Sequence, residues 1–109
     1  MVGKLARSTT YYASLEAKNV SNYVWRKNEV NLGTSRPTDR TSPIYSAGWL
    51  SSVRPATITE NEVRPGELAH FEFYIKTPSS QVDSKEYFNI VHDGKSWLND
   101  LGMHFIIST

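Results

Sequence analysis

Two segments of this chain alternate apolar and polar residues with a period of two. From Glu67 to Lys76 the apolar side chains recur at every second position, at Ala69, Phe71, Phe73 and Ile75. From Thr9 to Lys18 the same spacing places Tyr11, Ala13, Leu15 and Ala17 on one side. Alternation of this kind is typical of a β-strand with one buried face. We predict that both segments are strands and that they face a shared core.

The C-terminal third of the chain predicts a hairpin followed by a final strand. Glu86 to Val91 is rich in aromatic and β-branched residues, and the following His92 to Lys95 contains Asp-Gly, a strong hairpin-turn signal. Ser96 to Leu98 is predicted to begin the return strand. Asn99 to Gly102 is expected to break or bulge this strand, and Met103 to Ser108 is expected to complete the sheet.

The remaining sequence predicts short strands and one long loop. Ile58 to Val63 is a shorter strand candidate, ended by the turn Arg64 to Glu67 with Pro and Gly at its central positions. No window shows the periodicity and caps of a helix, and turn clusters recur at the spacing of an all-β sandwich. Leu32 to Pro55 is irregular and rich in Ser, Thr, Pro and Arg. A loop of that length is usually functional or held by its own side-chain bonds.

Length and charge narrow the class of protein. A chain of 109 residues, 39% hydrophobic and 21% charged, can bury one core. We therefore treat residues 1–109 as a single domain, in which Met1 to Ser8 forms a flexible or atypical first strand.

The net charge of +1 is far from the basic excess of a nucleic-acid-binding surface. No run approaches the ~20 apolar residues of a membrane span, and the start lacks the apolar run of a secretory signal. We expect no nucleic-acid binding and no membrane insertion.

The residue types that usually carry catalysis are sparse. The sequence has no Cys, which excludes disulfides, thiolate zinc sites and a Cys nucleophile. His70 and His104 lie on the polar side of predicted strands, and His92 lies beside the predicted hairpin turn. No pair of carboxylates has a spacing specific to catalysis, and the Asp and Asn residues show no calcium-loop spacing. We expect no catalytic residue, no metal site and no cofactor.

The long loop concentrates residues suited to ligand binding. They are Arg36, Arg40, Tyr45, Trp49 and Arg54. Flat rings stack on the apolar faces of sugars or peptides, while guanidinium groups donate to hydroxyls or carboxylates. Trp97 in the predicted hairpin is a sixth candidate. In the alternative interpretation the same side chains hold the loop together, and Trp49 closes the open end of the sandwich.

Five runs of this sequence, in this order and spacing, resemble the four-tryptophan (FW) domain. They are LGTSRPTDR (residues 32–40), SPIY (42–45), WLSSVRP (49–55), VRPGELAHFEFYIKTP (63–78) and EYFNIVHDGKSWLNDLGMHF (86–105). FW domains occur in the neighbour-of-breast-cancer-gene-one autophagy receptors and, in bacteria and their phages, in exported proteins beside peptidoglycan-cleaving domains. The resemblance covers residues 9–108 and implies an immunoglobulin-like antiparallel β-sandwich of about seven strands.

The resemblance carries over only in part. Trp25, Trp49 and Trp97 correspond to three of the tryptophans of the family, and the one expected in the first strand has no counterpart. We therefore expect one sheet edge to be missing or built differently. Residues 79–85 replace a tight Gly-containing turn of the family, and this loop is expected to be open.

Three functions remain possible at this stage. The first is a non-catalytic targeting module of a bacterial or phage peptidoglycan hydrolase, which binds cell-wall polysaccharide or surface glycan outside the cell. The second is a protein-interaction module like that of the autophagy receptors, cytoplasmic, and either monomeric or dimerised through an open edge. The third is an immunoglobulin-like spacer of a surface or virion protein without a ligand. The absence of Cys favours a bacterial or phage origin for an extracellular domain, and a cytosolic domain would equally lack disulfides.

Overall fold

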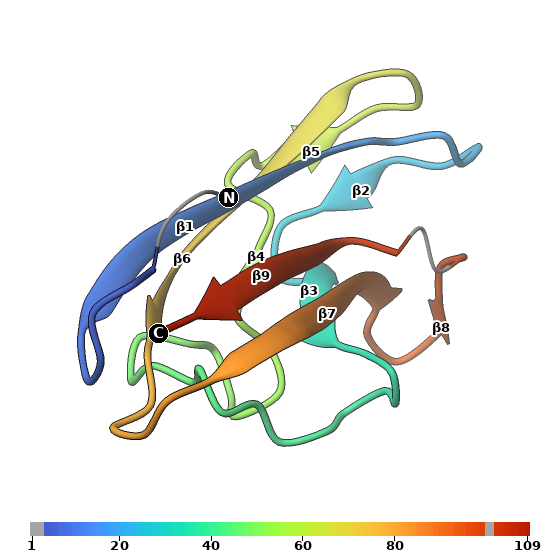
Figure 1. Ribbon diagram of the computed structural model, residues 1–109. Coiled ribbons are helices and arrows are strands. Elements are labelled where there is room, and N and C mark those ends of the chain that lie inside the picture. Colours follow the sequence, from blue (N-terminus) through green and yellow to red (C-terminus); the bar gives the residue numbers. More distant parts are fainter. Residues whose placement is uncertain (1–3, 100–101) are drawn as a thin grey trace.

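The computed structural model describes residues 4–99 and 102–109, which contain nine β-strands and no helix (Figure 1). The strands are β1 (Thr10–Lys18), β2 (Trp25–Arg26), β3 (Val30–Thr34), β4 (Ala56–Thr57), β5 (Glu62–Val63), β6 (Leu68–Lys76), β7 (Asp83–His92), β8 (Ser96–Trp97) and β9 (His104–Ser108). The all-β prediction is confirmed. So are the two strands predicted from alternation, which are β1 and β6.

All strand pairs are antiparallel (Figure 1). β1 pairs with β6 along its whole length, from Thr10 opposite Lys76 to Lys18 opposite Leu68. β2 and β5 form a separate short ribbon. The largest sheet has the order β4-β3-β7-β8, and β9 also pairs with β7. β7 is therefore the central strand of this sheet, with β9 along its first half and β8 along its second half.

Aromatic side chains join the β1-β6 sheet to the five-stranded sheet. The ring centroid of Phe73 in β6 lies 5.8 Å from that of Phe88 in β7, and Phe105 in β9 lies 6.0 Å from each of them. All three pairs meet edge to face, the arrangement that aromatic quadrupoles favour. Phe88 is fully buried, and burial of one such side chain stabilises the fold by about 1.5–3 kcal/mol. The expected shared core of β1 and β6 is therefore closed by the second sheet.

Both turns predicted from Gly-containing motifs are present. The amide of Glu67 donates to the carbonyl of Arg64 at 2.9 Å, and Gly66 has a φ of 90°. The amide of Lys95 donates to the carbonyl of His92 at 2.9 Å, and Gly94 has a φ of 81°. Only Gly adopts such φ values without strain, which explains why these residues close the two turns.

The structure differs from the predictions at the edges of the long loop. Residues from Leu32 onward were expected to be irregular, but Val30–Thr34 forms β3. Every residue of β3 is buried. Val30 and Leu32 alternate with Asn31 and Gly33, but a run of four residues is too short to mark a strand by its period alone. In the predicted strand Ile58 to Val63, only Glu62–Val63 is a strand, while Ile58 makes an isolated bridge to Phe71. Met1 to Gly3, and Asp100 and Leu101 of the predicted break, lie outside the described residues.

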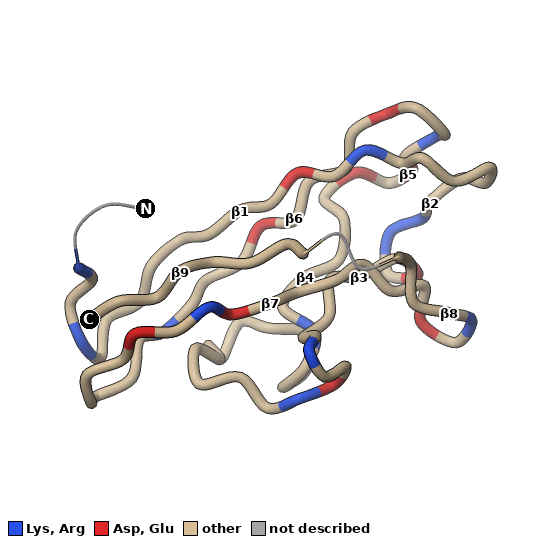
Figure 2. The backbone as a smooth tube through the Cα atoms, turned by 45° about the vertical axis from the view of Figure 1, so that its right-hand side comes forward, with Lys and Arg blue, Asp and Glu red and all other residues tan. Residues whose placement is uncertain are grey.

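Charged residues are interspersed along the chain. Figure 2 shows basic and acidic positions alternating over the strands and loops, in keeping with the net charge of +1. In the part of the chain that the structure describes, no helix is long and apolar enough to cross a membrane.

Candidate functional site

Arg40 anchors the long loop to β7. Its Nε donates to the carbonyl of Ser35 at 2.7 Å, and its Nη2 donates to the carbonyl of Tyr87 at 2.9 Å. Its Nη1 lies 2.9 Å from Oε1 of Glu86, and the two side chains are only 18% and 7% exposed. Three separate acceptors therefore engage this guanidinium group inside the protein. Arg40 acts here as a brace between the loop and the sheet.

Arg54 forms a second brace, on the outer side of the five-stranded sheet. Its guanidinium group donates to the carboxylates of Asp39 and Asp93 and lies 5.0 Å from the ring centroid of Trp97. The hydrogen bond from Arg54 and the one from Asn31 hold the pKa of Asp93 below its usual range, against the opposing effect of burial. Gly33 makes this packing possible, because a Cβ there would lie 2.6 Å from the Trp97 ring.

The other three predicted residues lie elsewhere on the loop. The guanidinium carbon of Arg36 lies 4.2 Å from the ring centroid of Tyr87. Trp49 is 6% exposed, and its indole N–H donates to the carbonyl of Tyr74 at 2.6 Å. Tyr45 packs edge to face on Trp49 at 5.4 Å and is 43% exposed.

The six predicted residues therefore do not converge on one surface. The structure brings Arg54 to Trp97 and Tyr45 to Trp49. Arg36 and Arg40 both contact Tyr87, the first at its ring and the second at its backbone carbonyl. In this arrangement the ring of Trp49 faces the core rather than solvent. The contacts match the interpretation in which these side chains hold the loop together.

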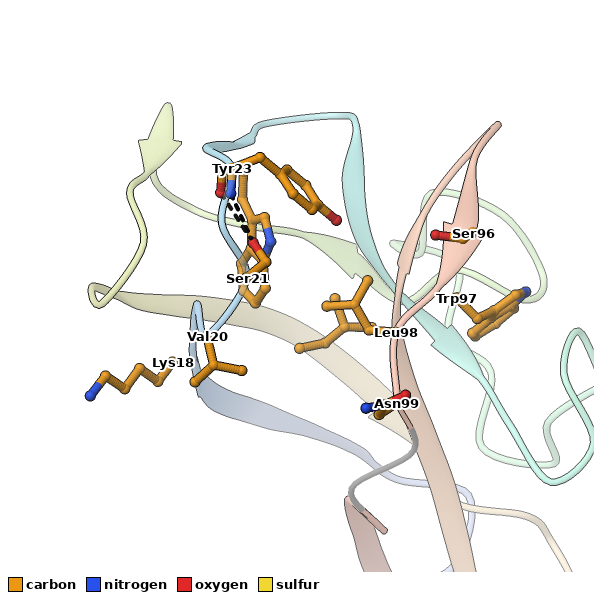
Figure 3. Close-up of a pocket in the computed structure, with 10 residues that line it drawn as sticks. Lys18, Val20, Ser21, Tyr23, Ser96, Trp97, Leu98 and Asn99 are labelled. Atoms are coloured by element: carbon orange, nitrogen blue, oxygen red, sulfur yellow. Dashed lines mark hydrogen bonds between the residues drawn. The ribbon is translucent and has the colours of Figure 1, made fainter.

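A groove lies at another place, between the loop after β1 and the segment that contains β8 (Figure 3). Its volume is ≈ 340 Å³. The apolar part of its lining comes from Val20, Tyr23, Trp25, Ile90 and Leu98. Lys18, Ser21, Ser96 and Asn99 supply its polar groups. A volume in this range and an apolar lining with a few polar groups are typical of small-ligand sites.

Val20 and Tyr23 give the groove an accessible apolar surface. Val20 is 81% exposed and Tyr23 is 37% exposed. Leu98 lies on the opposite wall (Figure 3). Trp97 also borders the groove, but its ring points away from Tyr23 and Leu98, toward Gly33 and Arg54.

Asn19 fixes the shape of the wall that carries Val20. It is fully buried, and its side-chain amide donates to the carbonyls of Tyr23 and Val63, both at 2.9 Å. Its Oδ1 accepts from the amide and the hydroxyl of Ser21. A buried amide with all these partners holds the loop in one conformation, so the groove is preformed.

No family model matches this chain, and no curated protein or solved structure gives a significant match. Within residues 4–99 and 102–109, no group of three or more His, Asp or Glu side chains is arranged to hold a metal ion. The candidate site therefore rests on the geometry of the groove.

This groove was not predicted from the sequence. Tyr23 and Val20 lie in a short loop without alternation, and Leu98 was predicted only as part of a return strand. The one available signal was composition, because the segment from Val20 to Trp25, between β1 and the start of β2, contains two apolar side chains and two aromatic rings. Isolated apolar loop residues are common on protein surfaces, and only the fold brings these beside Leu98.

Proposed function

We propose that this chain is a non-catalytic binding module built on an immunoglobulin-like β-sandwich and related to the FW domains. The facing β1-β6 and five-stranded sheets support the sandwich. The burial of Trp25 and Trp49 supports the correspondence with tryptophans of that family. The proposed ligand is a polysaccharide of a bacterial cell wall or surface, and the proposed setting is the outside of the cell, within a larger protein.

The observation that carries this proposal is the preformed groove beside Tyr23. A sugar ring has apolar C–H faces and a rim of hydroxyl groups. The ring of Tyr23 and the side chains of Val20 and Leu98 can contact the faces, whereas Ser21, Ser96 and Asn99 can exchange hydrogen bonds with the rim. This combination suits a glycan better than a purely apolar ligand.

Co-sedimentation with purified cell walls and their polysaccharide fractions tests the proposal. Val20→Asp is the informative variant, because Val20 is 81% exposed and its replacement disturbs no core packing. We expect saturable binding of the wild-type protein and a loss of at least about ten-fold in affinity for Val20→Asp, since a charge then occupies the apolar wall. Leu50→Asp is the matched control, because Leu50 is 56% exposed and does not line the groove. Absence of binding to every fraction, or equal losses in both variants, would contradict the proposal.

A protein-interaction module is the second candidate function. The observation that favours it is a pair of sheet edges, one on β1 and one on β9, that border a second groove. On this proposal the domain is cytoplasmic, as in the autophagy receptors. A spacer without a ligand would leave both grooves without a role.

A further inference from the structure

The sheets expose one edge of β1 and one edge of β9. Among the described residues, β1 pairs only with β6, and β9 pairs only with β7. These are strands of nine and five residues. Unpaired edges carry rows of free amides and carbonyls that can bind another strand.

The backbone hydrogen bonds between β7 and β9 identify which β9 residues face the free edge. The amide of Thr109 donates to the carbonyl of Val82, and the amide of Phe88 donates to the carbonyl of Met103. In an antiparallel ladder such bonded pairs recur at every second residue, so odd-numbered positions of β9 bond to β7. The amides and carbonyls of His104, Ile106 and Ser108 therefore point to the free edge.

One of these edge-facing groups, the carbonyl of Ser108, already accepts a hydrogen bond from within the chain. The amide of Leu5 donates to the carbonyl of Ser108 at 2.7 Å. The side chain of Leu5 is partly buried and packs against the core. One backbone amide from outside the strands thus binds the β9 edge. Within residues 4–99 and 102–109, the edge-facing backbone groups of His104 and Ile106 have no such partner.

An apolar groove runs beside these free groups. It has a volume of ≈ 400 Å³, and its lining includes Leu5, Tyr11, Ala13, Ile75, Phe105 and Ile107. His104 and Ile106 of β9 and Tyr12 and Ser14 of β1 also line it. Ile106 and Tyr12 at the rim are 41% and 58% exposed. An occupant must offer backbone donors and acceptors on one side and small apolar side chains toward the floor.

We propose that this groove binds an extended peptide segment of a partner protein, which adds to the β9 edge next to Leu5. Only an extended polypeptide presents amides and carbonyls at the spacing of His104 and Ile106. The apolar floor selects β-branched or other aliphatic residues at alternate positions of the peptide. This proposal deepens the protein-interaction candidate and is independent of glycan binding in the groove beside Tyr23.

The test is a titration of the ¹⁵N-labelled protein with an acetylated, amidated peptide of sequence Lys-Val-Thr-Val-Thr-Val-Lys. The amides of His104 and Ile106 should shift and become protected from hydrogen exchange, because they acquire acceptors. The amides of Phe105 and Ile107 should stay protected throughout, because they already face β7.

Ile106→Pro provides the decisive variant. Proline removes an amide that faces the free edge and leaves the β7 ladder intact. We expect peptide affinity to fall about five-fold, as expected for one backbone hydrogen bond. Ile106→Thr keeps the amide and serves as the matched control, with the affinity of the wild type.

Three results would overturn the proposal. They are absence of shifts at millimolar peptide, equal affinities of Ile106→Pro and Ile106→Thr, and a concentration-dependent dimer in which both edges are protected before peptide is added. The last result would assign the groove to a second copy of the chain. Cell-wall binding and its loss in Val20→Asp are measured separately, so either proposal can fail without the other.

Discussion

Arg40 and Arg54 illustrate how the same residue type can serve recognition or structure. In a sequence, arginines beside aromatic residues in an irregular segment fit both interpretations. The structure gives each guanidinium group several partners, with Glu86 for Arg40 and two aspartates for Arg54. At the residue scale, we therefore expect these arginine contacts to stabilise the fold, and substitutions can test this.

Gly33→Ala tests the close packing of Trp97. A Cβ at this position would lie 2.6 Å from the Trp97 ring and 2.9 Å from Nη1 of Arg54. We expect a loss of about 1–3 kcal/mol in the free energy of unfolding, because the ring and the guanidinium group must both move. Urea denaturation measures it. Gly48→Ala is the control, since a Cβ at Gly48 meets nothing within 4 Å. Equal midpoints for the two variants would contradict the described packing.

Arg40→Met tests the brace between the loop and β7. The variant leaves the carboxylate of Glu86 buried without its cation, and we expect a loss of about 3 kcal/mol in the free energy of unfolding. Adding Glu86→Gln to this variant removes the uncompensated charge and should recover part of the loss. Denaturant unfolding of both proteins checks this expectation. A double variant as unstable as Arg40→Met would count against a buried ion pair at this position.

At the element scale, the alternation of apolar and polar residues predicted which side chains face the core, but not which strands pair with each other. β1 and β6 were predictable because each has one buried and one polar face. β3 was not, because Val30 and Leu32 alternate with Asn31 and Gly33 over only four residues. The two-residue strands β2, β4 and β5 depend on partners distant in sequence, and so few residues carry no readable period. β8 differs, because it pairs with β7 across the predicted Asp-Gly turn.

The free edge of β1 predicts a pattern in amide exchange. The amide of Asn19 donates to Glu67 and that of Thr77 to Thr9, so odd-numbered residues of β1 face β6 and even-numbered ones face outward. We expect slow hydrogen exchange at Ala13 and fast exchange at Ser14, measured by NMR in the free protein. Equal protection at both would show that a further strand already covers this edge.

His70 couples β6 to β1 and to the segment before β5. Its two ring nitrogens face carboxylate oxygens of Glu60 and Glu16, and hydrogen bonding to Glu60 raises the pKa of His70. Partial burial is the largest single effect on the pKa of Glu60 and acts to raise it. The hydrogen bonds from the ring and the amide of His70, a further backbone hydrogen bond and the charge of His70 together outweigh burial and lower that pKa.

These pKa shifts predict a pH-dependent stability. A raised pKa in the folded state means that the His70 contribution is complete below the ordinary value of 6.5 and is lost as the pH rises through the raised pKa. The Glu60 contribution is lost only as the pH falls through its lowered pKa. We expect the difference in Tm between wild type and His70→Gln to be larger at pH 6 than at pH 8.5. Glu60→Gln should remove most of this pH dependence, whereas a difference that is constant with pH would contradict the contact.

At the scale of the whole molecule, both grooves arise from tertiary arrangement. Val20 and Leu98 are far apart in the chain, and so are Tyr11 and Phe105, yet each pair lines one groove. Periodicity and composition do not show which distant residues the fold brings together. For this reason, all the predicted site residues except Trp97 came from one continuous segment, the long loop. Within the described residues, β1 and β9 each expose one edge. That this reflects the absence of a first-strand tryptophan like that of the FW domains stays a prediction.

The central claim is that the groove beside Tyr23 is the ligand site of a binding module. Titration of the ¹⁵N-labelled domain with soluble cell-wall glycan fragments tests it most directly. The account predicts saturable shifts at the amides of Val20, Tyr23 and Leu98, which disappear in Val20→Asp and persist in Leu50→Asp. Spectra unchanged by every fragment, or shifts confined to the loop from Arg36 to Arg54, would contradict it.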